Sequence, residues 1–268
     1  YSALEVLRNK DFGEMTWDEI EAAKAALTMM RWPVAERATR RVRRAFRGHQ
    51  LELRHVVRDN LRYGGEPLLL RWRQRKSRPR PVVVLCDISG SMERYSRMLL
   101  HFLHTLNHKM RDIETFLFGT RLTRITHHLR HKDVDDALAE VGQIVQDWSG
   151  GTKIGEAIKT FNYQWARRVL GRGAVVLIIS DGWDRGDVTQ LAREMERLQR
   201  AAYRIIWLNP LLGSERYEPV QRGMTAALPF VDDFLPVHNL HSLAELAQAL
   251  SALAERRPER RQHVERIT

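Results

Sequence analysis

The chain has 268 residues, of which 43% are hydrophobic and 29% are charged, and its formal net charge is +11. This hydrophobic content can bury a full core, so wholesale disorder is excluded, and the length suits one large domain or two smaller ones. The longest apolar runs, Val82–Cys86 and Ala174–Ile179, are far shorter than the about 18 residues of a membrane-spanning helix. The single cysteine, Cys86, excludes a disulfide scaffold and a zinc site built from several cysteines.

No secretory leader pattern opens the sequence, which starts at Tyr1 rather than at a methionine. Together with the single cysteine, this pattern favours a reducing compartment. We therefore expect a cytoplasmic protein without a membrane span.

The positive charge is concentrated in one stretch of the chain. Residues 31–80 contain sixteen Lys and Arg residues and four acidic residues, a net charge of +12, whereas the rest of the chain sums to −1. Fifteen of the sixteen are Arg, which pairs bidentately with carboxylates and phosphates. Three interpretations of this basic stretch stay open: it binds an acidic protein partner, it forms a solvated face, or it binds nucleic acid. Nucleic acid is the least favoured, because few aromatics are available for base stacking. The candidate partner-binding residues are Arg40, Arg41, Arg43 and Arg44.

The N-terminal part is predicted to be mainly helical. Residues 1–50 have a helical pattern, and Thr16 with Glu19 three residues later forms a capping-box signature. Residues 51–63 indicate a short extended piece and then a helix that ends at Gly64-Gly65.

A strand candidate at Leu68–Trp72 and a polar connector at Gln74–Pro81 complete this part. We therefore expect three regions. Residues 1–80 form an Arg-rich, mainly helical N-terminal extension, residues 81–254 form the main domain, and residues 255–268 form a charged tail.

Strands and helices alternate from Pro81 onward. The predicted strands are Val82–Asp87, Ile113–Phe118, Leu122–Thr126, Ala174–Ser180, Arg204–Leu208 and a short piece within Leu228–Val237. The predicted helices are Met92–Met110, Val134–Val145, Gly155–Leu170, Val188–Ala202 and His241–Ala254. This alternation predicts an α/β fold with a doubly wound, mostly parallel sheet. The Gly119-Thr120 turn permits a hairpin, which adds one antiparallel edge strand.

Three polar clusters lie where such sheets place their sites, outside the carboxyl ends of strands. They cover residues 87–91, 149–152 and 180–182. Carboxylate and hydroxyl oxygens without soft ligands favour Mg²⁺, with Mn²⁺ as an alternative. Helix N-caps explain one such cluster, but three in neighbouring positions favour a metal site. The predicted ligands are Asp87, Ser89, Ser91, Thr152 and Asp181.

The Asp-x-Ser-x-Ser pattern at residues 87–91, followed by a distant Thr and a distant Asp, resembles the metal-ion-dependent adhesion site of von Willebrand factor A domains. The resemblance covers residues 81–254 and implies a von Willebrand factor A or Rossmann-like fold. It implies that the Ser and Thr hydroxyls ligate Mg²⁺ and that the two Asp act directly or through water. The last coordination position is left for an acidic residue of a partner.

The flanking sequences resemble those of the bacterial CoxE-like branch. They are GGEP at 64–67, CDISGSM at 86–92, WSGGTKIG at 148–155 and SDGWDRGD at 180–187. The Arg-rich region before the first strand of the main domain adds to this resemblance. It implies a cytoplasmic adaptor or chaperone that works with a MoxR-type AAA+ ATPase. The implied task is the maturation of a client metalloenzyme, notably a molybdenum hydroxylase such as carbon monoxide dehydrogenase.

Several residues beside the predicted ligands are candidates for the rim or for contacts behind the ligands, namely Gly151, Trp183 and Asp184. Asp184 either orients a water or a hydroxyl at the site or caps the helix from Val188, and Asp187 is predicted to cap that helix. Trp183 is either an exposed anchor for a partner or a core residue.

Two further chemistries are less favoured. His101, His104 and His108 share a helix face, but no carboxylate or cysteine lies at close ligand spacing, so we expect a polar outer face rather than a metal site. A Mg²⁺-dependent phosphohydrolase is not favoured, because the sequence shows neither a nucleophile–base pair nor a phosphate-binding Lys at a strand end. We therefore predict a binding module without catalytic residues.

Overall fold

The computed structural model describes residues 3–48, 50–66, 68–130, 134–144, 151–171, 173–213 and 221–253. The expected charged tail over residues 255–268 lies outside these ranges. The chain forms two compact units, which we name the ribbon unit (Ala35–Pro79) and the sheet unit (Tyr1–Val34 with Arg80–Thr268). The expected extension over residues 1–80 is therefore divided, because its first 34 residues belong to the sheet unit.

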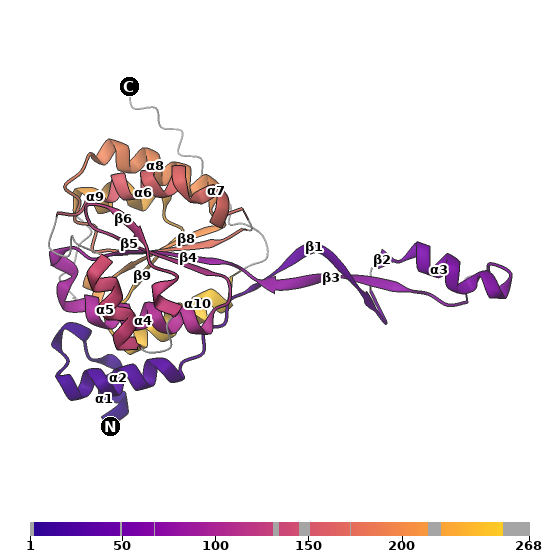
Figure 1. The fold of residues 1–268 in the computed structure, drawn as a ribbon, viewed down its shortest axis with the longest axis horizontal. Coiled ribbons are helices and arrows are strands. Elements are labelled where there is room, and N and C mark those ends of the chain that lie inside the picture. Colours follow the sequence, from indigo (N-terminus) through magenta and orange to yellow (C-terminus); the bar gives the residue numbers. More distant parts are fainter. Residues whose placement is uncertain are drawn as a thin grey trace. The chain divides into compact units, whose positions relative to one another are not determined.

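The sheet unit contains a mostly parallel sheet, with strand order β6-β5-β4-β7-β8-β9 in the described residues (Figure 1). The strands are β4 (Val82–Asp87), β5 (Ile113–Phe118), β6 (Leu122–Arg124), β7 (Val175–Ile179), β8 (Arg204–Asn209) and β9 (Asp233–Pro236). Only the β5–β6 pair is antiparallel among them. The predicted fold class is thus confirmed, including its antiparallel edge strand.

Helices cover both faces of this sheet (Figure 1). One face carries α4 (Glu93–Lys109), α5 (Val134–Ile144) and α10 (Leu240–Ser251), and the other carries α6 (Ile154–Gln164), α7 (Ala166–Val169), α8 (Val188–Ala201) and α9 (Arg222–Ala227). Alternate residues of β4 enter the two cores, since Val84 packs in one and Val83 in the other. A strand that is buried on both faces reads as a continuous apolar run, which explains why the sequence identifies β4 and β7.

Two N-terminal helices, α1 (Ala3–Asn9) and α2 (Trp17–Met29), join the core on the α4 side of the sheet. The predicted capping box is confirmed, because the Thr16 N–H donates to Glu19 Oε2 over 2.7 Å. Leu27 of α2 is fully buried in the same core. Among the described residues, no helix is long and apolar enough to cross a membrane.

The packing of α2 against α4 corrects one expectation about the histidines. His101 and His104 are buried, so the predicted polar outer face of this helix is wrong for these two residues, and His108 alone of the three is exposed. The sequence pattern contained no sign that a further helix covers α4. In the described part of the chain, no group of three His, Cys, Asp or Glu side chains is placed to hold a metal ion.

The ribbon unit is built around an antiparallel sheet with strand order β1-β3-β2. Its elements are β1 (Glu36–Ala45), β2 (Gln50–Leu51), α3 (Leu53–Asn60), a 3₁₀ turn (Leu61–Tyr63) and β3 (Trp72–Pro79). The predicted helix across residues 1–50 is therefore wrong from Glu36 onward. The strand expected at Leu68–Trp72 instead begins at Trp72, and most of the expected connector at Gln74–Pro81 is β3.

Residues 36–45 pair as a strand with β3 although Ala and Arg favour helices. In a helix, Arg37, Arg40, Arg41 and Arg44 would share one face at spacings of three and four residues. Like charges at that spacing destabilise a helix. In the extended strand, neighbouring side chains alternate between the two faces, which separates consecutive cations.

A buried amide attaches α3 to the segment before β3. The Asn60 side chain is almost fully buried, and its Nδ2 donates to the carbonyls of Val56 and Leu69 over 2.6 and 2.9 Å. Its Oδ1 accepts from the Leu69 N–H over 2.8 Å. One side chain therefore satisfies both backbone groups of Leu69.

Replacement of this amide tests how the ribbon unit is held together. Asn60→Ala leaves the Leu69 N–H and C=O without their partner, and we expect a local loss of about 1–3 kcal/mol. Amide hydrogen exchange should accelerate in α3 and leave the sheet unit unchanged. Asn9→Ala, which removes an exposed amide, is the matched control. Unchanged exchange in α3 of the Asn60 variant would contradict this role.

Candidate metal centre

Asp87 is the last residue of β4, and its carboxylate is fully buried. Its Oδ1 accepts from the Ser89 N–H over 2.9 Å, and its Oδ2 accepts from the Ser180 hydroxyl over 2.7 Å. Ser180 follows the neighbouring parallel strand, β7, so the hydrogen bond joins the carboxyl ends of the two central strands. Both oxygens of Asp87 are therefore held in fixed positions.

The two predicted serine ligands lie side by side on the loop after β4. Their Oγ atoms are 3.1 Å apart, and the Ser91 hydroxyl acts to lower the pKa of the Asp181 carboxyl group. Ile88, between Asp87 and Ser89, is buried in the core. The expectation that the two hydroxyls turn to the same side of a tight loop agrees with this contact.

Asp181 follows β7 and is also buried. Its Oδ1 accepts from the Trp183 N–H over 3.0 Å. The Gly182 backbone has a φ of 83°, and a Cβ there would lie 2.9 Å from the Met224 side chain, so glycine is required on both grounds. This tight turn directs the chain from β7 past Asp181 to the rim of the site.

Burial of both carboxyl groups changes their acidity. Desolvation raises the pKa of Asp87 to about 7, although hydrogen bonds from Ser89 and Ser180 oppose this rise. Desolvation also raises the pKa of Asp181, against the opposing effect of hydrogen bonds from Ser91 and Trp183. The charge of each ionised carboxylate is thus poorly stabilised by the surrounding protein.

Thr152 lies just before α6 and is almost fully buried. Its carbonyl accepts from the Arg185 N–H over 2.9 Å, which attaches its segment to the loop after Asp181. The described contacts thus bring Asp87, Ser89, Ser91 and Asp181 into one network and place Thr152 on the adjoining loop. The preceding residues of the cluster, 149 and 150, and Trp148 lie outside the described residues.

The contacts of Asp184 correct one of the two predictions for it, a cap on the helix from Val188. Its Oδ1 accepts from the N–H of Ile154, the first residue of α6, over 3.0 Å and from the Gly186 N–H over 2.9 Å. Asp184 therefore caps the helix that begins next to Thr152, and its buried Oδ2 has no hydrogen-bond partner among the described residues. The prediction for Asp187 is confirmed, because its Oδ1 accepts from the Thr189 N–H at the start of α8 over 2.9 Å.

Arg185, at the rim of the site, is a residue that the sequence analysis missed. A Cβ on Gly151 would lie 2.7 Å from Cδ of Arg185, so glycine at this position lets the arginine cross the Thr152 segment. Trp183 is exposed, which favours the anchor interpretation over the core interpretation. Ser180 was likewise given no role, and the only available signal was its position next to Asp181.

The predicted partner-binding arginines lie on β1, in the ribbon unit, and they do not form one surface. Arg43 pairs with Gln74 and Arg44 with Arg73 across the ribbon, so these two side chains lie on opposite faces. Arg40 and Arg41 lie where the register shifts between Ala38 and Val42.

Three solved structures are similar to this chain over about two thirds of its length. A von Willebrand factor type A protein from Catenulispora acidiphila is 15% identical with a TM-score of 0.48, and the match covers 67% of this chain and 43% of that one. Proximal thread matrix protein 1 from the mussel byssus, described with a zinc-occupied MIDAS motif, is 14% identical with a TM-score of 0.41, covering 64% and 46%. An aerotolerance-related membrane protein from Bacteroides fragilis is 15% identical with a TM-score of 0.41, covering 63% and 97%.

The chain spans less than half the length of the first two of these proteins. No curated protein matches the chain. The family model described as "VWA domain containing CoxE-like protein" matches residues 22–243, which include the loops after β4 and β7 and the segment before α6. On this match over most of its length, the chain belongs to the family of VWA domain containing CoxE-like proteins.

Proposed function

We propose that this protein is a Mg²⁺-dependent binding module that captures an acidic residue of a partner protein. The observation that carries the proposal is the contact network among Asp87, Ser89, Ser91 and Asp181 at the carboxyl ends of β4 and β7. Such strand ends are where open parallel sheets bind their ligands. Membership of the CoxE-like family supports the same interpretation.

The donor set fits a hard divalent cation. Two buried carboxylates and two adjacent hydroxyls offer only oxygen, which Mg²⁺ and Mn²⁺ prefer over nitrogen and sulfur. Burial raises the pKa of both Asp87 and Asp181, so a bound metal would stabilise their ionised forms. The proposed ligands are Asp87, Ser89, Ser91, Thr152 and Asp181.

When bound, Mg²⁺ offers a coordination position that an external carboxylate can occupy. The chain's own residues orient the donors. Ser180 holds one oxygen of Asp87, and the cap by Asp184 fixes the start of α6 next to Thr152. The exposed Trp183 lies on the loop that follows Asp181, where it can contact the partner around the captured carboxylate.

We propose a MoxR-type AAA+ ATPase as the working partner and a metalloenzyme as the client. The family resemblance supports both assignments, and a molybdenum hydroxylase such as carbon monoxide dehydrogenase is the client that it favours. On this proposal, the module holds the client in the cytoplasm while ATP hydrolysis remodels it. The basic residues Arg40, Arg41, Arg43 and Arg44 would steer acidic surfaces toward the module.

The pairing of β1 with β3 gives one observation in favour of nucleic acid as a second candidate. Arg37 pairs with Arg78, and Arg44 with Arg73, directly across β1 and β3. Like charges placed opposite each other destabilise a ribbon, and a polyanion would relieve the repulsion. A two-stranded ribbon also fits the major groove of DNA.

Metal binding is tested by two aspartates of the same loop. We expect Mg²⁺ to raise the melting temperature of the wild-type protein and to bind Asp181→Ala at least tenfold more weakly, since a proposed ligand is lost. Asp187→Ala is the matched control, because it removes a helix cap and should keep the Mg²⁺ response. Titration calorimetry measures both affinities. Equal Mg²⁺ binding by the two variants would refute the site.

Burial of Asp87 predicts a pH dependence of stability in the metal-free protein. The unfolded chain releases this proton near pH 4, while in the folded protein the pKa is about 7. The folded state binds more protons between these values, so the free energy of unfolding falls as the pH rises through this window, by roughly 2–4 kcal/mol. Urea unfolding in EDTA should show this slope and Asp87→Asn should remove most of it. An identical slope in both proteins would contradict the prediction.

The partner and the second candidate function are separated by two binding assays. Pull-down of a MoxR-type ATPase should require Mg²⁺ and should fail with EDTA or with Asp181→Ala. Binding to a 20-base-pair duplex should be weak at physiological salt. If the duplex binds tightly with a steep salt dependence and the ATPase is not captured, the nucleic-acid interpretation replaces the proposal.

A further inference from the structure

The outer surface of α3 and of the 3₁₀ turn that follows it (Leu61–Tyr63) carries an apolar stripe. Leu53, Val57 and Leu61 lie at spacings of four residues, and their exposed fractions are 67%, 62% and 66%. Residues at this spacing lie above one another on one side of a helix. Single exposed apolar residues are normal on protein surfaces, but a contiguous stripe indicates an interaction site.

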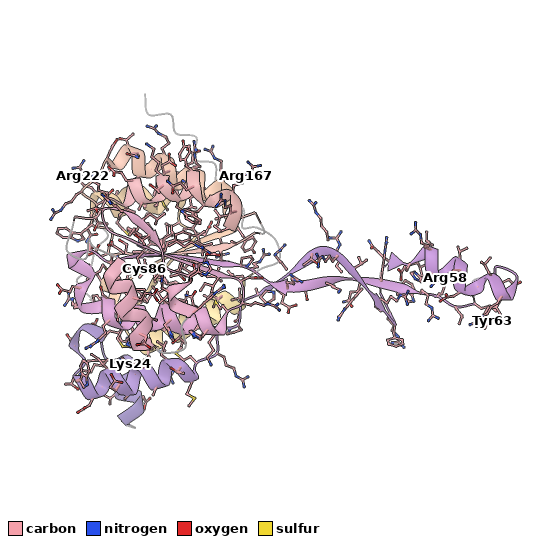
Figure 2. The ribbon with its side chains drawn as sticks, in the orientation of Figure 1. Lys24, Arg58, Tyr63, Cys86, Arg167 and Arg222 are labelled. Atoms are coloured by element: carbon pink, nitrogen blue, oxygen red, sulfur yellow. The ribbon has the colours of Figure 1, made fainter. Side chains whose placement is uncertain are left out.

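A second stripe of the same spacing consists of arginines. Arg54, Arg58 and Arg62 each follow one of the three apolar residues, and all three are exposed. The Arg62 guanidinium lies 4.9 Å from the centre of the Tyr63 ring, and Arg58 and Tyr63 are seen at the exposed surface of this segment in Figure 2. The outer surface of α3 therefore combines three apolar side chains with three cations, and we name these six residues the α3 face.

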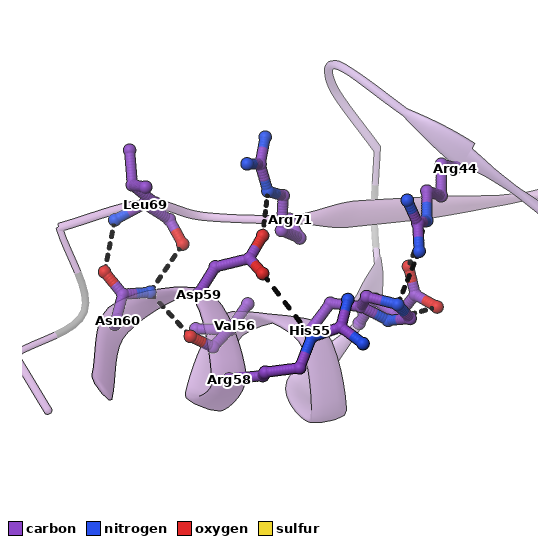
Figure 3. A network of polar contacts seen from close by, with 9 residues as sticks. Arg44, His55, Val56, Arg58, Asp59, Asn60, Leu69 and Arg71 are labelled. Atoms are coloured by element: carbon purple, nitrogen blue, oxygen red, sulfur yellow. Dashed lines mark hydrogen bonds and ion pairs between the residues drawn. The ribbon is translucent and has the colours of Figure 1, made fainter. Parts of the chain in front are cut away.

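The inner side of α3 is already engaged within the ribbon unit (Figure 3). Arg71 Nε donates to Asp59 Oδ2 over 2.8 Å, and the Asn60 amide binds both backbone groups of Leu69. His55 lies between Glu52 and Arg44, with its Nδ1 2.8 Å from Glu52 Oε1 and its Nε2 2.5 Å from Arg44 Nη2. Of the α3 face, Arg58 takes part in these contacts, because its Nε lies 3.7 Å from Asp59 Oδ1, and its guanidinium stays exposed.

A helix of eight residues is marginally stable in water by itself and depends on tertiary contacts. In α3, those contacts are mostly polar, while three large apolar side chains remain in water. Burial of these three side chains would stabilise the helix, and that burial requires a partner. The exposed stripe therefore indicates a binding role rather than a contribution to the stability of the free protein.

We propose that the α3 face binds an acidic amphipathic helix of a partner protein. Apolar side chains of that helix would cover Leu53, Val57 and Leu61, and its carboxylates would pair with the arginines beside them. The stripe is about 12 Å long, which matches the contact length of two short helices. A preformed, fixed helix also favours a protein of complementary shape over a membrane surface. No metal takes part, so the inference goes beyond the proposed function and stands independently of it.

The test uses the full-length protein in EDTA and a defined probe. The probe is a fluorescent 18-residue helical peptide with Leu at positions i, i+4 and i+8 and Glu along both flanks, and its binding is measured by anisotropy. We expect Val57→Asp to weaken binding at least tenfold, and the triple variant Arg54→Glu, Arg58→Glu, Arg62→Glu to do the same. Circular dichroism should stay unchanged, because all four side chains are exposed.

A matched charge reversal separates the α3 face from general attraction. The triple variant Arg111→Glu, Arg121→Glu, Arg193→Glu makes the same change in net charge at exposed positions of the sheet unit and should weaken binding less than threefold. A peptide with Lys in place of Glu should not bind. The Asp181→Ala variant should bind the Glu peptide like the wild type, so failure of the metal site leaves this test intact.

Four outcomes of the peptide assay would overturn the inference. They are absence of peptide binding, equal losses in the two triple variants, full binding by Val57→Asp, and equal binding of the Lys peptide.

Vesicles of phosphatidylcholine and phosphatidylserine in a 3:1 ratio provide the remaining comparison. If the wild-type protein binds these vesicles more tightly than the peptide and Val57→Asp does not, the surface is a membrane contact and the inference is wrong.

Discussion

The proposed site depends on one interaction, the hydrogen bond from the Ser180 hydroxyl to the buried Asp87 carboxylate. It joins two residues that lie 93 positions apart in the sequence, and it can form because β4 and β7 are adjacent and parallel. Burial makes ionisation of Asp87 unfavourable. The fold thus prepares a carboxylate that a cation at the sheet edge would stabilise, and the neighbouring hydroxyls and Asp181 supply oxygen atoms next to it.

The fold and the proposed ligands could be predicted because their signals are local. β4 and β7 are uninterrupted apolar runs, and the polar clusters follow them directly. Contacts between distant segments could not be predicted. Nothing near Asp184 in the sequence indicates that it caps α6, thirty residues earlier, and nothing near His101 indicates that α2 packs against α4. Local propensity was misleading at β1, where pairing with β3 outweighs the helical preference of the sequence.

The ribbon unit has a net charge of +10 and the sheet unit a net charge of +1, but the two units recognise the same chemistry in our account. In the sheet unit, a cation held by carboxylates would attract an acidic side chain. In the ribbon unit, β1, β3 and the α3 face offer guanidinium groups to acidic surfaces. The net charge of +11 therefore lies almost wholly in the ribbon unit. An acidic protein partner is the one class of molecule that suits both units.

The most direct test of the central claim is anomalous diffraction from crystals soaked in Mn²⁺, which replaces Mg²⁺ at oxygen sites. Our account predicts one Mn²⁺ ion at the carboxyl ends of β4 and β7, bonded to the hydroxyl oxygens of Ser89 and Ser91. Crystals of Asp181→Ala should lack this ion. The account is contradicted if Mn²⁺ binds elsewhere on the chain, or if the wild-type and variant crystals show the same anomalous peak.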